Sequence, residues 1–100
     1  MSDVLTPATF SDAVGTVFAL MTAQGEPGME LTLATLVQHS PSPGAPRAEP
    51  FSLVFVGSVG RNIPQATYTL RHADLGSLDI FLVPIGPKAD GRHQYEASFN

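Results

Sequence analysis

The feature of this sequence that most constrains its fold is an alternation of apolar and polar residues with a period of two. Such a period places successive side chains on opposite faces of an extended strand. Apolar segments of this kind recur between turn-forming glycines and prolines, at residues 16–21, 29–38, 51–56, 66–72, 78–83 and 94–99. Most connections between them are too short for parallel crossovers, so we predict an all-β, mainly antiparallel fold.

One short helix is predicted over residues 6–15, where Thr6 precedes Pro7 in the arrangement of a helix cap and Gly15 ends the segment. Phe10 and Val14 are expected to plug one end of the β core. About six strands on 100 residues make a small barrel or a two-sheet sandwich, and both remain open. The chain is expected to form a single domain over residues 1–100.

Individual segments carry further expectations. The row from Met29 to Val37 alternates without a break, which predicts one long inward face. Residues 51–56 are apolar on both faces except at Ser52, which is typical of a strand covered on both sides. Pro84 is expected to end the fifth strand, and Asp90-Gly91 predicts a hairpin turn. The proline-rich segment 40–50 is predicted to be an exposed loop.

Composition excludes several function classes. The formal net charge is −4 and the five basic residues are scattered, so neither nucleic acid nor an anionic membrane surface is an expected partner. The absence of cysteine excludes disulfides and thiolate chemistry. No secretory signal is recognisable near Met1, which favours a cytoplasmic protein and leaves export by another route open. No cofactor or metal site is predicted.

No coherent catalytic set is visible either. His39, His72 and His93 fall at predicted strand ends or in turns, which indicates surface or rim positions. Asp74 lies in a segment that resembles a turn, where its carboxylate would accept hydrogen bonds from nearby backbone amides. Asp79 is expected on an outer strand face, with a buried pairing to Arg71 as the alternative. The chain is therefore not expected to be an enzyme.

Four segments, residues 51–57, 68–76, 81–86 and 95–100, together resemble a family of small bacterial proteins defined only as a domain of unknown function. The resemblance implies genes beside phage-tail-collar-like proteins, and hence an accessory or structural partner of a tail-like or surface assembly. It implies no catalytic residues.

These observations favour a non-enzymatic interaction or assembly module. It would act as a homo-oligomer or with a protein partner, through two strands with open edges. A first alternative is a ligand carrier, with Arg71, His72 and Asp74 as polar contacts and Tyr68 as an apolar wall at a barrel mouth. A second is a small enzyme that uses His72 with Asp74 or Asp79.

Overall fold

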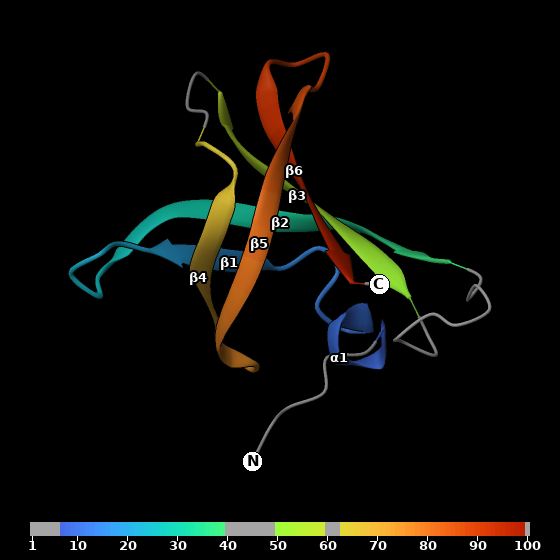
Figure 1. Ribbon diagram of the computed structural model, residues 1–100, viewed down its shortest axis with the longest axis horizontal. Helices are drawn as coiled ribbons and strands as arrows, with labels where there is room; N and C mark the ends of the chain where they lie inside the picture. Colours follow the sequence, from blue (N-terminus) through green and yellow to red (C-terminus); the bar gives the residue numbers. More distant parts are fainter. Residues whose placement is uncertain (1–6, 40–49, 60–62, 100) are drawn as a thin grey trace.

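Each of the six alternating segments forms a strand, and the strands close into one antiparallel barrel (Figure 1). The structure is a computed structural model and describes residues 7–39, 50–59 and 63–99. Its elements are α1 (Pro7–Ser11), β1 (Val17–Met21), β2 (Pro27–Gln38), β3 (Phe51–Val59), β4 (Ala66–His72), β5 (Gly76–Pro87) and β6 (Arg92–Phe99). The predicted all-β, antiparallel architecture with one short N-terminal helix is confirmed.

The order of strands around the barrel is β1-β2-β3-β6-β5-β4, and β4 pairs back onto β1. The first three strands and the last three thus form two meanders, which meet where β3 lies beside β6 and where β1 lies beside β4. This closure decides between the two architectures that the sequence left open, because a sandwich would leave its two sheets unjoined. The two longest strands, β2 and β5, have 12 residues each.

Period-two burial builds the core as expected. The large side chains with no or almost no exposed surface on the strands are Phe18, Leu31, Leu33, Phe51, Leu53, Phe55, Leu70, Ile80, Leu82 and Tyr95. Phe18 and Phe55 meet edge to face across the interior, with ring centroids 5.3 Å apart. Full burial of each such side chain stabilises the fold by roughly 1.5–3 kcal/mol relative to exposure.

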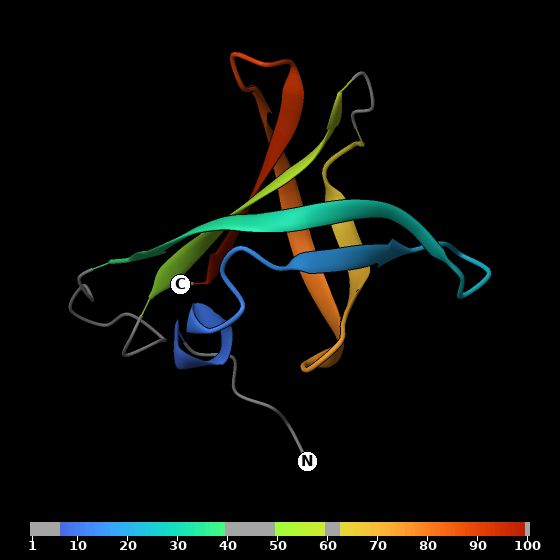
Figure 2. The ribbon, with the colours of Figure 1, turned by 180° about the vertical axis from the view of Figure 1, so that it is seen from behind.

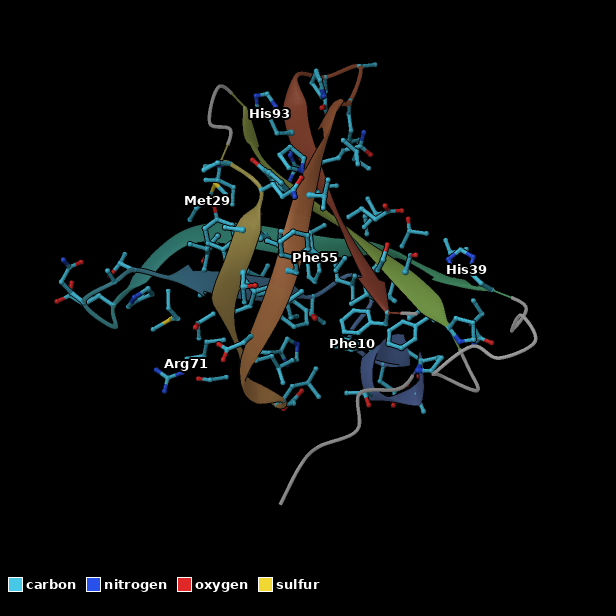
Figure 3. The ribbon with its side chains drawn as sticks, in the orientation of Figure 1. Phe10, Met29, His39, Phe55, Arg71 and His93 are labelled. Atoms are coloured by element: carbon cyan, nitrogen blue, oxygen red, sulfur yellow. The ribbon has the colours of Figure 1, made fainter. Side chains whose placement is uncertain are left out.

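Helix α1 closes one end of the barrel through a cluster of three phenylalanine rings (Figure 3). Phe10 is fully buried, and its ring centroid lies 5.9 Å from those of both Phe51 and Phe99. The rings of Phe51 and Phe99 stack at 4.6 Å. The predicted role of Phe10 as a plug is therefore confirmed.

The helix is shorter than predicted. It ends at Ser11 and is followed by turns, in which the Ala13 amide donates to the Phe10 carbonyl and the Thr16 amide to the Ala13 carbonyl. Gly15 has a φ of 89°, a left-handed conformation that redirects the chain into β1. Consequently Val14 is 41% exposed, and its predicted role as a plug is wrong; Ala13 is buried instead. The proposed cap at Thr6 lies outside the described residues.

A β-bulge breaks the long alternation that was predicted for β2. The pairing of β2 with β3 shifts between Leu33 and Thr35. One extra residue exchanges the two faces of the strand beyond it. Leu36 therefore packs against the core, whereas Thr35 and Val37 are exposed, and the expected inward row is wrong past Leu33.

Proline positions account for two further corrections. β5 does not end at Pro84 but continues to Pro87, because its pairing with β6 shifts between Pro84 and Gly86 and a bulge tolerates the missing N–H. Residues 40–49 of the predicted exposed loop lie outside the described residues. Pro50, the last residue of that loop, is buried, and its carbonyl accepts a hydrogen bond from the His39 amide at 2.8 Å.

Other expectations hold. Both faces of β3 are covered, since Ser52 and Val56 are buried as well as the inward residues. The turn at Asp90-Gly91 forms, with the Lys88 amide bonded to the Arg92 carbonyl at 2.8 Å.

We expect the Phe10→Ala substitution to lower the free energy of unfolding by about 3–5 kcal/mol, because it empties the centre of the ring cluster. Val14→Ala, at an exposed neighbouring position, should change it by less than about 0.5 kcal/mol. Urea denaturation followed by far-UV circular dichroism measures both. Equal effects of the two substitutions would contradict the assignment of Phe10 as the plug.

Candidate functional site

The four residues predicted to bind a ligand do not converge on one site. Along β4, Tyr68 and His72 face inward on either side of the fully buried Leu70. Arg71 faces outward and extends into solvent (Figure 3). Asp74 lies exposed in the turn between β4 and β5. The side chains therefore occupy an inner face, an outer face and a turn.

His72 is the most constrained polar side chain of this set. It is 6% exposed, and its ring lies 4.5 Å from the ring of Phe18. Nδ1 accepts hydrogen bonds from the backbone amides of Asp74 and Leu75, at 3.0 and 3.3 Å. Since Nδ1 must offer a lone pair to these amides, the ring carries its hydrogen on Nε2.

The opposite ring nitrogen extends this pattern into a chain of hydrogen bonds. Nε2 of His72 donates to Oγ1 of Thr16 at 2.8 Å, and Thr16 Oγ1 in turn donates to the carbonyl of Ala13. We call these bonds the His72 network. It connects the turn after β4 with the segment between α1 and β1, and it satisfies every polar atom of the imidazole within the chain.

Two expectations from the sequence are corrected by the His72 network. His72 is a buried residue and not a surface one. It is also the imidazole of His72, and not the carboxylate of Asp74, that accepts the backbone amides of the turn. A signal for this was present, because His72 follows Tyr68 and Leu70 at a spacing of two on the inward face of its strand.

Asp79 lies on the outer face of β5, as expected. Its Oδ1 accepts a hydrogen bond of 2.7 Å from Oγ1 of Thr69, the residue directly opposite on β4. The alternative, a buried Asp79 paired with Arg71, does not form, since both side chains are exposed. Among the described residues, the ion pair present is that of Lys88 with Asp90. Asp79 and the inward His72 therefore lie on opposite faces of the sheet.

The remaining two histidines, His39 and His93, lie in different parts of the molecule (Figure 3). His39 follows β2, and its Nε2 lies 2.8 Å from Oγ of the buried Ser52. His93 lies near the start of β6 and is half-buried. Within residues 7–39, 50–59 and 63–99, no three His, Asp or Glu side chains come together as metal ligands would.

Tyr68 and Tyr95 make the polar contacts of the connection that leads into β4. The hydroxyl of Tyr95 accepts the Ile63 amide at 3.1 Å, and that of Tyr68 donates to the Pro64 carbonyl. Partial burial raises the pKa of Tyr68 above its ordinary value of 10.0, and the neighbouring Tyr95 adds to the rise. Tyr68 thus keeps its proton in the folded chain where an exposed phenol would begin to lose it.

The sequence predicts two strands with open edges but does not identify them. Among the residues that it describes, the structure leaves the ends of β2 and β5 without a neighbouring strand on one side (Figures 1 and 2), and α1 packs near β2. β2 extends past β1. The segment that leads into β1 bonds to β2 as far as Leu33, through the amide of Gly15 and the carbonyl of Thr16. Residues 35–38 pair with β3 on one side and, among the described residues, with no strand on the other. We call this segment the β2 edge.

A second uncovered segment lies on β5, which extends past β4 after the pair Ala66–Leu82. Residues 83–87 pair only with β6 within the described part of the chain, and we call them the β5 edge. The prediction of two strands with open edges therefore holds only for parts of strands. Closure leaves no strand open along its full length. Within the described ranges, the β2 and β5 edges are two of several segments that pair on one side only, among them residues 27–31 of β2 and 66–69 of β4.

The fold and these edges define a small closed antiparallel β barrel, plugged by a helix, with two strand ends that project beyond their neighbours. The chain belongs to the family described as Domain of unknown function (DUF6916), whose model matches residues 5–99. The resemblance to a family defined only in this way is confirmed. No curated protein and no solved structure is significantly similar to the chain. No helix in the described ranges has the length and apolar character needed to cross a bilayer.

The raised pKa of Tyr68 has a consequence at alkaline pH. The folded chain binds more protons than the unfolded chain near pH 10, so stability should fall as the pH rises through this range. Absorbance at 295 nm, recorded for wild type and Tyr68→Phe, isolates the Tyr68 titration as a difference. We expect its midpoint above 10.0 in the folded protein. A midpoint at or below that value would contradict the described environment.

Proposed function

We propose that this protein is a non-enzymatic interaction module that joins other protein subunits by adding a strand at the β2 edge. The observation that carries the proposal is that residues 35–38 are hydrogen-bonded to a neighbouring strand on one side only, among the described residues. A strand end of this kind presents backbone donors and acceptors in the pattern that another strand can complete.

The chemistry of the two edges favours β2 over β5. The β5 edge contains Pro84 and Pro87, which lack the N–H that strand addition requires, and its bulge distorts the pairing pattern. The β2 edge, Thr-Leu-Val-Gln, contains no proline and no charge. Two of its residues, Thr35 and Val37, are β-branched and exposed, which suits them to pairing in a sheet.

The partner that fits this edge is a second copy of the same chain. Antiparallel pairing of one edge with itself about a twofold axis satisfies both copies at once. Because residues 35–38 are uncharged, such pairing places no like charges opposite one another, although each chain has a net charge of −4.

The internal contacts of the site residues support this proposal over a ligand carrier or an enzyme. A ligand that used the ring nitrogens of His72 would first have to break the His72 network. An enzyme that paired His72 with Asp79 would need groups from opposite faces of one sheet. The acidic, scattered charge likewise favours protein over nucleic acid or membrane as a partner.

A finer proposal is that the self-associated protein serves as an accessory subunit of a tail-like or surface assembly. Its support is the resemblance noted from the sequence, together with the repeated use of strand pairing that such an assembly would require. The β2 edge is the surface through which the subunits would join.

The Val37→Lys substitution tests the use of the β2 edge. We expect the wild-type protein to self-associate at concentrations of tens of micromolar. The substitution should raise the dissociation constant of the dimer at least about tenfold, because it brings two lysines together across the twofold axis. Ile85→Lys is the matched control, since Ile85 is similarly exposed (47% against 40%) but lies on the proline-containing β5 edge. Sedimentation equilibrium measures all three proteins.

A wild-type protein that remains monomeric at about 100 μM would overturn the pairing of copies. Equal weakening by both substitutions would show that the β2 edge is not the contact. Circular dichroism of each variant establishes that the barrel is intact, because both positions are exposed and neither substitution removes a core side chain.

A further inference from the structure

The barrel is closed most weakly where β1 meets β4. This seam contains two register pairs, Ala19 with Arg71 and Leu20 with Leu70. By contrast, β3 and β6 are joined by seven pairs, and so are β4 and β5. Each pair contributes backbone hydrogen bonds or side-chain contact. Opening the sheet between β1 and β4 therefore breaks the fewest pairing interactions and should cost the least free energy.

Side chains continue the seam where the backbone pairing stops. In an antiparallel register the next two opposing residues after Ala19 and Arg71 are Phe18 and His72, and their rings lie 4.5 Å apart. Beyond them the His72 network joins Thr16, just before β1, to the last residue of β4. The network is partly buried, so its hydrogen bonds meet little competition from water.

The same network also holds the helix plug. The hydroxyl of Thr16 donates a hydrogen bond to the carbonyl of Ala13, a buried residue that follows α1. The Ala13 amide in turn bonds to the carbonyl of Phe10 at 2.9 Å. One imidazole is therefore connected, through three successive hydrogen bonds, to the residue that closes the end of the barrel.

We infer that the β1–β4 seam is the point at which the barrel opens, and that the His72 network is the latch that keeps it shut. Release of the latch frees the facing edges of β1 and β4 and loosens α1, while the long β3–β6 and β4–β5 ladders stay paired. This concerns edges that are covered in the closed barrel, and it is independent of pairing at the β2 edge.

Residue-resolved amide hydrogen exchange under native conditions tests the latch. In the wild-type protein, the protected amides of β1 and of its partner residues on β4 should exchange before those of β3 and β6. Thr16→Val keeps the branched shape of the side chain but removes the hydroxyl that His72 requires. We expect it to accelerate exchange at the seam about tenfold, the effect of losing a buried hydrogen bond. The β3–β6 amides, which exchange only when the whole barrel unfolds, should accelerate by no more than the same factor and should remain slower than the seam.

Two control variants distinguish a latch from a general loss of stability. Thr16→Ser restores the hydroxyl and should return seam exchange to near the wild-type rate. Thr69→Val removes a hydroxyl that bonds to Asp79 on an exposed ladder, and it should not alter the seam. The tautomer is checked separately by the ¹⁵N shifts of His72, which should show the hydrogen on Nε2.

The inference is overturned if Thr16→Val leaves the seam unchanged, or if Thr69→Val, whose bond lies on a ladder that stays paired, accelerates the seam as much as β3 and β6. If Thr16→Val does not fold, the wild-type order of exchange decides: seam amides that exchange only together with those of β3 and β6 would refute the opening point. Because the readout is exchange within one chain, a failure here leaves the proposed self-association intact, and the reverse also holds.

Discussion

Closure of the sheet, by pairing of β4 back onto β1, is the constraint on which the rest of the structure depends. The inward side chains come from both meanders, and they share one interior only because the meanders are joined at both sides. A six-stranded barrel is narrow, so its interior is filled by side chains such as Phe18, Phe55 and Tyr95. The contact that completes this barrel is nevertheless its shortest ladder. The fold therefore relies on packing and on the His72 network to hold a seam that backbone pairing alone holds weakly.

The sequence could locate the strands because burial on one face produces a local signal, the period of two. The segment 66–72 was predicted with the bounds that β4 has, and the others differ by a few residues at their ends. Closure could not be predicted, because it depends on pairing between Ala19 and Arg71, which are far apart in the chain. The bulges at Leu33 and Pro84 were missed for a related reason, since an extra residue is recognised only against its partner strand.

The candidate site illustrates the same division. The inward position of His72 was implicit in the alternation of β4, but a histidine at a strand end was interpreted by its residue type, which favours the surface. Its partners could not be found in the sequence, because Thr16 lies 56 residues away and contacts His72 only once the barrel is closed. The β2 edge was equally invisible. Whether residues 35–38 have a neighbour depends on where β1 ends relative to β2, and that is a property of register.

The β2 edge and the β5 edge arise from one geometric cause. β2 and β5 have 12 residues each, whereas the neighbours that they outrun, β1 and β4, have five and seven. In each long strand a bulge lies near the point where the short neighbour ends. Beyond the bulge, the side chains that would have pointed inward point outward, and the reverse. At β5 the projecting end contains prolines, a common means by which proteins prevent edge-to-edge association. The corresponding end of β2 has neither proline nor charge, and Val37 is exposed beside it. The two projecting ends thus differ in chemistry, because prolines protect one of them and not the other.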